Sequence, residues 1–429
     1  MTDLSRRSVL QGATAIIGAT FLPFDSAQAQ GKPLSIFAHR VHQTVSNGQA
    51  GDITKAWADA NKVAVQWTTF DTPPLQERLF REASLNETSV DVGFILNTQA
   101  VPRAAALFEN LDTYQQKDSI EDFNDIFPGL RDGMRVNNQL LAVPFRHATS
   151  GLHYNEELLA ERGFSKPPST MEELIEMAKA CTYRRADGTQ VVGFLVPGVT
   201  YPNVIDIARA WDGEFITPDF KCTAEQAPML KATKMLRELF QAGACPRNFS
   251  TLGTEEVNTW MQQGRAAFCL NSMGRNRIFN DPAKSKFPGK IKTMAAPSSK
   301  DIQHKYDVAP AKVEFWGMGI PKNAQRKDMS WSFIKAMASK ENVLKAGLNG
   351  NGPVRNSTYD SAEFKNTVPY AEEERRLLKV GRIPLPAFDE ATRAGDYFKE
   401  ELEAAVLGMK TPEQALADLC KRVQPLLPA

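Results

Sequence analysis

The chain of 429 residues is long enough for two or three domain-sized units with sizeable buried cores. Its 51 Lys and Arg residues nearly balance its 50 Asp and Glu residues, and a net charge of +1 excludes the strong positive field that attracts nucleic acids. Hydrophobic residues at 42% and charged residues at 24% are typical of a soluble globular protein.

The first thirty residues have the pattern of an export signal. Ser5-Arg6-Arg7-Ser8 precedes an apolar stretch at residues 13–22, and the small residues Ala27-Gln28-Ala29 end it. The stretch is shorter than the ~20 residues that span a bilayer. Paired arginines before a moderately apolar core resemble the twin-arginine signal, and the general secretory route is the alternative. We therefore expect a signal peptide at residues 1–29 and a mature protein free in the periplasm.

Strands and helices alternate after this segment. Residues 34–38, 63–67 and 90–96 predict strands, the last apolar enough for a buried parallel sheet. Residues 52–60 and 75–83 between them predict helices with apolar positions on one face. Such alternation is typical of a doubly wound α/β lobe.

A second region begins near residues 140–144. Thr170 with Glu173 predicts a capping box at the start of a helix over 171–181. The tail from residue 370 is expected to be mostly helical. The other expected elements are helices at 155–162, 204–211, 228–241, 255–263 and 328–338, and strands at 191–196, 266–270 and 290–295.

Motifs for catalysis or metal binding are absent from the sequence. It contains no G-x-S-x-G, H-E-x-x-H or G-x-x-x-x-G-K-[ST] pattern, and the glycine-rich run at 347–352 follows a helix, as a C-cap and turn would. His39 and His42 have no carboxylate pair nearby to complete a metal site. We expect no catalytic residue, no metal and no cofactor. The alternative is a secreted hydrolase or isomerase that uses His39 and His42 as acid and base.

The five cysteines are widely spaced and odd in number, so at least one thiol is free. One disulfide between distant cysteines is an open alternative. A chain that folds before export would not depend on disulfides. The residues concerned are Cys181, Cys222, Cys245, Cys269 and Cys420.

Four segments resemble, in order, the carbohydrate-type extracellular solute-binding proteins of ABC importers, the family that includes maltose-binding protein. Counting from the expected first strand, the resemblance covers roughly residues 34–360. The segments are Leu152-His153-Tyr154-Asn155-Glu156-Glu157-Leu158 with Pro167-Pro168 and Thr170-Met171-Glu172-Glu173-Leu174, Trp211-Asp212-Gly213-Glu214-Phe215, Trp260-Met261-Gln262-Gln263-Gly264-Arg265-Ala266-Ala267-Phe268, and Gly319-Ile320-Pro321-Lys322-Asn323-Ala324 with Gly352-Pro353-Val354-Arg355.

The resemblance implies two doubly wound α/β lobes of the type II periplasmic-binding-protein kind, closing on a ligand and delivering it to ABC permease subunits. We expect residues 32–143 plus 297–345 in the N-terminal lobe and residues 148–292 plus 352–429 in the C-terminal lobe. Crossovers are expected near 143–148, 294–297 and 349–356. The protein is expected to be a monomer that binds no nucleic acid.

Candidate ligand-binding residues follow from strand ends and from the family's positions. Ligands of doubly wound sheets lie beyond the carboxyl ends of the strands, and the crossover and the family turn add further positions. The twelve candidates are His39, Arg40, Asn97, Thr98, Arg146, His147, Tyr201, Trp211, Asn271, Arg275, Trp316 and Arg355.

The same residues leave the ligand's charge open. Tyr201, Trp211 and Trp316 are either platforms for the apolar faces of a sugar or parts of the core. Arg40, Arg146, Arg275 and Arg355 either form lobe-closing ion pairs or bind an acid group. Met273-Gly274-Arg275 stands where sugar binders of the family often carry an aromatic residue. A neutral sugar or polyol and an acidic one, such as a sugar acid, are therefore both hypotheses, as are amine, metal and peptide ligands on the same fold.

Overall fold

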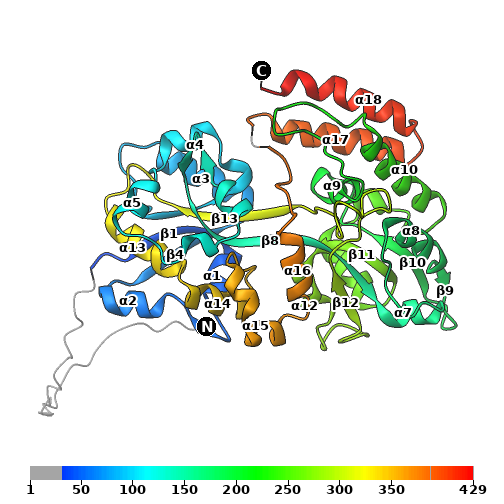
Figure 1. The fold of residues 1–429 in the computed structure, drawn as a ribbon, viewed down its shortest axis with the longest axis horizontal. Coiled ribbons are helices and arrows are strands. Elements are labelled where there is room, and N and C mark those ends of the chain that lie inside the picture. The colour runs from blue at the N-terminus through cyan, green and yellow to red at the C-terminus, as the bar shows by residue number, and fades with distance from the viewer. Residues whose placement is uncertain (1–30, 387, 429) are drawn as a thin grey trace, which may run out of the picture.

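The computed structural model describes residues 31–386 and 388–428, so the predicted signal peptide lies outside the described residues. Strands form one mixed sheet that runs through both halves of the molecule (Figure 1), and β12 joins it by pairing with β8. In spatial order the main path is β4 (Val65–Phe70), β1 (Leu34–His39), β5 (Val92–Leu96), β13 (Val313–Gly319), β8 (Val143–Asn155), β11 (Ala266–Ser272), β10 (Gln190–Leu195) and β9 (Tyr183–Arg184), with β12 at Ile291–Met294.

The first lobe is the left half of Figure 1. Here β1 pairs in parallel with β4 and β5, as the predicted strand–helix alternation requires. Two short hairpins, β2 (Asn47–Gly48) with β3 (Gly51–Asp52) and β6 (Arg135–Val136) with β7 (Gln139–Leu140), lie outside the main sheet. Its helices are α1 (Arg40–Ser46), α2 (Lys55–Asn61), α3 (Thr72–Ala83), α4 (Pro102–Leu107), α5 (Asp112–Lys117), α6 (Pro128–Asp132), α13 (Lys327–Met337), α14 (Lys340–Leu348), α15 (Ala362–Thr367) and α16 (Ala371–Leu378).

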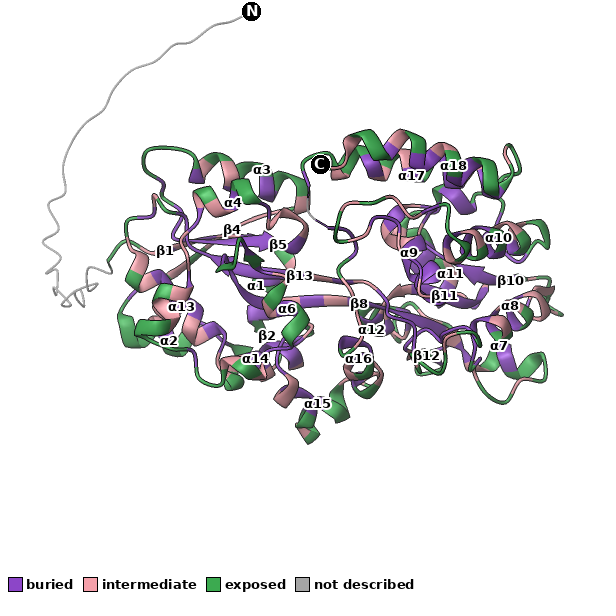
Figure 2. Cartoon of the chain, turned by 45° about the horizontal axis from the view of Figure 1, so that its top comes forward, coloured by how far each residue is buried: buried purple, intermediate pink, exposed green. Residues whose placement is uncertain are grey.

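The second lobe is built around β10 and β11, which pair in parallel. Figure 2 shows the pattern common to both lobes: buried strands inside, and helices with exposed outer faces. Its helices are α7 (Glu156–Glu161), α8 (Met171–Ala180), α9 (Tyr201–Arg209), α10 (Ala227–Gln241), α11 (Thr254–Gln262), α12 (Asn276–Phe279), α17 (Ala391–Val406) and α18 (Pro412–Val423).

The observed elements confirm the predicted α/β class of two doubly wound lobes. Thr170 Oγ1 accepts a hydrogen bond from the amide of Glu173, as a helix N-cap does. The predicted capping box is only half formed, because the Glu173 carboxylate accepts instead from the amide and hydroxyl of Ser169. The glycine-rich run ends α14 as predicted, with Gly350 in the left-handed region at φ +99°.

Buried side chains divide the chain into lobes at other positions than we predicted. Ala309 packs in the core of the second lobe, although residues 297–345 were predicted in the first, whereas Val308 and Ala311 on either side of it pack with the first lobe. Conversely, Val354, Tyr359 and Phe364 pack in the core of the first lobe, although 352–429 was predicted in the second. The reason is that residues 354–378 turn back onto β8 and α14 before the chain crosses again near residue 382.

A disulfide between Cys222 and Cys420 joins the loop before α10 to α18 across 198 residues of sequence. Cys181, Cys245 and Cys269 are free and buried, so the prediction of at least one free thiol is confirmed.

Candidate functional site

Two long strands carry the chain between the lobes and frame the candidate site. The first half of β8 pairs with β13, and its second half pairs with β11 and β12 of the second lobe. The β8–β13 register shifts between Trp316 and Gly317, so that Arg146 lies opposite Trp316 and Ala148 lies opposite Glu314. Residues opposite one another share a face of the sheet, which places Arg146, Glu314 and Trp316 on the same face.

His39 ends β1 and caps α1 at the edge of this face. Its Nδ1 accepts a hydrogen bond from the amide of Val41, and its ring lies 6.1 Å from the ring of Trp316. Burial and the nearby Arg146 charge lower the pKa of His39, which keeps the imidazole neutral at pH 7. His42, one turn on, is fully buried and stacks on Phe94 at 4.2 Å, so it belongs to the core and not to an acid–base pair.

Three further candidates end strands of the first lobe. Arg40 lies exposed at the surface and pairs with Asp71, which follows β4, at 3.3 Å. Asn97 is buried, and its Oδ1 accepts a hydrogen bond from the amide of Phe315 on β13 at 3.2 Å. Thr98 is half-buried beside it. The structure therefore brings Asn97 to the crossing strands, where it closes the end of β5 onto β13.

Arg146 is the central charge of the region. Its Nε is buried and has no hydrogen-bond partner among the described residues. Burial lowers the pKa of Arg146, while Glu314, Glu374 and Tyr370 oppose that shift and Arg275 adds to it. Because these four groups act on its pKa, they surround the guanidinium at electrostatic range.

His147, the next residue, points to the opposite face and joins a buried polar chain. Its Nε2 lies 3.1 Å from the Tyr359 hydroxyl, which donates to Glu374 at 2.8 Å. Thr149 donates to the other carboxylate oxygen of Glu374 at 2.9 Å. Burial lowers the pKa of His147 to about 3 and raises that of Glu374 to about 7. This chain fastens β8 to α16 and makes His147 a structural residue.

The second lobe contributes Asn271 and Arg275 at the end of β11. Asn271 Nδ2 is buried without a partner in residues 31–386 and 388–428. Arg275 is half-buried in the short helix η4 (Met273–Arg275). A Cβ atom built at Gly274 would lie 3.9 Å from the Tyr370 hydroxyl, which places the start of α16 beside this turn.

Glu314 and Tyr370 were missed by the sequence analysis. Glu314 stands two residues before Trp316 in a strand, so the alternation of side chains already places both on one face. Tyr370 could not have been found from the sequence, because no local pattern in a helical tail indicates which strand end a residue will contact.

Two aromatic candidates lie in the second lobe's core. Tyr201 packs against Phe215 and Phe398, with ring centroids 5.3 Å away in both cases. Its hydroxyl is buried and has no partner among the residues described. Trp211 is 8% exposed and belongs to the same hydrophobic cluster. Of the three aromatic candidates, only Trp316 lies on the face that carries Arg146.

Arg355 is fully buried inside the first lobe. Its guanidinium donates to the carbonyl oxygens of Ala338, Asp122 and Glu121 and forms an ion pair with Asp125 at 3.3 Å. Four of its five N–H donors are thus used to hold loops together, which gives Arg355 a structural role.

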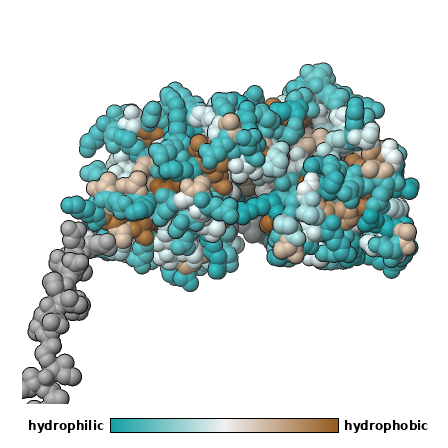
Figure 3. Space-filling model, turned by 90° about the horizontal axis from the view of Figure 1, so that it is seen from below, coloured by the Kyte–Doolittle hydropathy of each residue, from teal (hydrophilic) through white to brown (hydrophobic). Residues whose placement is uncertain are grey.

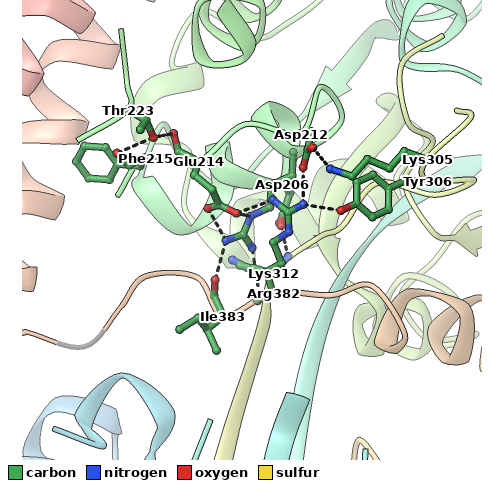
Figure 4. Close-up of polar contacts among 11 residues, drawn as sticks. Asp206, Asp212, Glu214, Phe215, Thr223, Lys305, Tyr306, Lys312, Arg382 and Ile383 are labelled. Carbon is green, nitrogen blue, oxygen red and sulfur yellow. Dashed lines mark hydrogen bonds and ion pairs between the residues drawn. The ribbon is translucent and has the colours of Figure 1, made fainter. Parts of the chain in front are cut away.

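A polar network on the second lobe holds the third passage of the chain between the lobes (Figure 4). Arg382 pairs through its backbone with Ala311 and Val313, and its side chain donates to Asp212, Glu214 and the Tyr306 hydroxyl. Arg209 donates to Glu214 and to the carbonyl oxygens of Arg382 and Ile383. Nearby, Asp206 accepts from the amide of Lys312 at 2.6 Å.

The surface seen from below in Figure 3 is largely hydrophilic, with hydrophobic side chains in separate spots and a recess between the two halves. Three surface pockets elsewhere contain none of the twelve candidates; they are lined around Phe164 and Glu172, around Thr44 and Trp67, and around Tyr154 and Asn280. Among residues 31–386 and 388–428, no three His, Cys, Asp or Glu side chains gather as a metal site would require. No helix within these ranges has the length and apolar character needed to cross a membrane.

Comparisons with known proteins agree with this architecture. A probable ABC transporter-binding protein of Deinococcus radiodurans is 28% identical over 151 residues, which cover 34% of this chain and only 36% of that relative. A probable amino-acid ABC transporter periplasmic-binding protein of Sinorhizobium fredii is 21% identical and aligns over 98% of this chain and 97% of its own. The mannitol-binding protein of Pseudomonas aeruginosa is 22% identical over 83% of this chain and 84% of its own.

Solved structures show the same fold at low identity. The maltose-bound MalE3 of T. maritima superposes with a TM-score of 0.75 at 21% identity, covering 92% of this chain and 100% of that one. A solute-binding protein of Agrobacterium vitis with bound D-mannitol gives a TM-score of 0.71 at 18% identity, covering 92% and 98%. The two lobes are therefore of the type II periplasmic-binding-protein kind, as predicted.

The family model for bacterial extracellular solute-binding proteins matches residues 52–371, which include both crossing strands and most of both lobes. The chain belongs to the bacterial extracellular solute-binding proteins.

Proposed function

We propose that this protein is the solute-capturing component of an ABC importer and takes a carbohydrate-like ligand, a sugar, polyol or sugar acid, between its lobes. The observation that carries this proposal is the arrangement of two separately cored lobes around β8 and β13. Unpartnered polar atoms of Arg146 and Asn271 lie where these strands and β11 meet the lobes. Relatives named for mannitol and solved neighbours with bound maltose and mannitol support the ligand class.

The ligand's contacts follow from the geometry. His39, Trp316 and Arg146 present one half of the site, with Asn97 and Thr98 behind them. Asn271 and Arg275 approach from the second lobe. Closure brings the two sets together, and the permease subunits recognise the closed form.

Export to the periplasm through the twin-arginine route is part of the same proposal and rests on residues 1–29. We expect a monomer, which light scattering on the purified protein measures directly. The alternative of a hydrolase or isomerase needs His39 and His42 as acid and base, and His42 is buried in the core. Chemical conversion of a bound sugar, detected by chromatography of the reaction mixture, would support the enzyme alternative.

The experiment that tests the proposal is a thermal-shift screen against neutral sugars, polyols, sugar acids, sugar phosphates, amino acids and short peptides. A ligand that binds only the folded state at ~100 times its Kd stabilises that state by about 2.7 kcal/mol. A shift with a carbohydrate-like compound supports the proposed class. A shift confined to amino acids or peptides would contradict it.

A further inference from the structure

The Arg146 guanidinium is held in place without a counter-ion. It forms no ion pair within 4.0 Å and no hydrogen bond with any described residue, and its Nε is buried. Part of the residue stays accessible, so a ligand between the lobes can reach the charged end. A desolvated guanidinium carries five donors and prefers a planar, two-oxygen acceptor such as a carboxylate.

The nearest acids do not serve as that acceptor. Glu374 is fully engaged by Thr149 and Tyr359. Glu314 lies diagonally across the β8–β13 ladder from Arg146, beyond ion-pair distance, and is half-exposed. Its carboxylate accepts no hydrogen bond from the residues that the structure describes, so it is free to accept from a ligand.

A second free cation stands on the other lobe. Arg275 makes no ion pair with any described residue, and it lies near enough to Arg146 to affect the latter's pKa. Two guanidinium groups that repel one another across the site are both stabilised when an anion lies between them.

We propose that the solute is a sugar acid, whose carboxylate binds Arg146 and Arg275 and whose neighbouring hydroxyl groups donate to Glu314. This inference rests on the proposed function and narrows its ligand class. A neutral polyol would leave the Arg146 charge without a counter-ion. A phosphate or other bare anion would meet the Glu314 carboxylate with no hydroxyl donor beside it, whereas a hydroxylated carboxylate satisfies both groups. Trp316, opposite Arg146, is only 6% exposed and packs in the core of the first lobe beside this site.

The test compares acids with alditols or sugars of the same carbon skeleton, by isothermal titration calorimetry on the purified protein. The pairs are gluconate with sorbitol, galactonate with galactitol, and glucuronate with glucose; glucose 6-phosphate and sorbitol 6-phosphate form a separate arm. In at least one pair, the acid is expected to bind ten times or more tightly than its neutral partner.

Single-residue variants test which side chains cause the preference for the acid over its neutral partner. Arg146→Gln is expected to remove the acid's advantage, so that the acid and its neutral partner bind with affinities within threefold of each other. Glu314→Gln is expected to weaken both members of the pair. Arg393→Gln, on the exposed surface of α17 with contacts to Glu390 and Tyr397 of the same helix region, is the matched control and should leave both affinities unchanged. The melting temperature of each unliganded variant shows that it has folded, and Arg146→Met, which also removes the charge, replaces Arg146→Gln if the latter has not.

The inference is overturned if the neutral partner binds as tightly as the acid in every pair, if sugar phosphates bind more tightly than sugar acids, or if the folded Arg146 variant keeps the preference. Binding of neutral sugars or polyols alone leaves the proposed function in place. Binding of no carbohydrate of any charge overturns both.

Discussion

Arg355 shows how a buried charge can be purely structural. Because its guanidinium satisfies three carbonyl oxygens and pairs with Asp125, removing it leaves several buried acceptors without donors. We expect Arg355→Ala to lower the free energy of unfolding by about 3–5 kcal/mol, measured by urea denaturation without ligand. Lys55→Ala, which removes an exposed pair with Asp59, should leave the free energy of unfolding almost unchanged. Equal losses would contradict the structural role.

Glu374 gives the protein a titration of unusual sign. Burial disfavours the carboxylate and raises its pKa to about 7 in the folded state, from an ordinary value of 4.5. Between pH 4.5 and 7 the folded protein therefore keeps a proton on Glu374 that the unfolded chain releases. As the pH rises through that window, the contribution of Glu374 to the free energy of unfolding falls by about 3 kcal/mol. Burial lowers the pKa of His147 to about 3 and that of His153 to about 4. The contribution of these two histidines to the free energy of unfolding therefore falls as the pH falls below 6.5, opposite to that of Glu374.

Glu374→Gln separates these contributions, because the amide keeps the contacts to Tyr359 and Thr149 but does not titrate. Between pH 5 and pH 8, the variant's free energy of unfolding should rise relative to wild type by about 3 kcal/mol. Denaturant titrations at both pH values measure the difference. A difference that does not depend on pH would show that Glu374 stays ionised in the folded protein.

The twelve site candidates show what single residues can and cannot reveal in the sequence. The predicted strand ends place His39 and Asn97 where β1 and β5 end, because the boundary of an apolar strand can be read locally. Burial of Tyr201, Trp211 and Arg355 could not be read, since it depends on helices up to two hundred residues away. The absence of a partner for Arg146 is likewise visible only once Glu314 and Glu374 have positions.

At the scale of elements, α18 is the helix whose attachment is covalent. Cys420 in α18 is joined to Cys222 across 198 residues, and such a bond restricts the unfolded chain. We expect reduction to lower the free energy of unfolding by about 2–4 kcal/mol. Melting temperatures with and without a phosphine reductant measure this. The double variant Cys222→Ala/Cys420→Ala should melt at one temperature in both conditions; a reductant effect in that variant would point to another target.

Elements differ in how much of them the sequence predicts. The helices α8, α10 and α11 and the strands β10 and β11 lie within two or three residues of their predicted bounds, because the helices have one apolar face of regular period and the strands are uninterrupted apolar runs buried on both faces. The thirteen-residue strand β8 was not predicted as a strand: residues 143–148 were expected to be a crossover and residues 155–162 a helix, because Arg146, Thr149 and Ser150 interrupt its apolar pattern. The helix α16 was expected as part of the helical tail from residue 370 and α15 was not predicted, and the packing of both on the first lobe depends on Tyr359 and Glu374.

At the scale of the whole molecule, closure must leave both cores intact. The strands β8 and β13 stay paired with each other and with strands of both lobes, and Arg382 fixes the third passage to the second lobe. Bending can therefore occur only where these segments leave a lobe, and the lobes move as rigid bodies. Saturating ligand should reduce the radius of gyration in small-angle X-ray scattering while the far-ultraviolet circular dichroism spectrum stays the same. A sugar that gives no thermal shift, added at the same concentration, is the control. A spectrum that changes with the radius would mean that binding folds a segment instead of rotating a lobe, and an unchanged radius would mean that the ligand occupies one lobe alone.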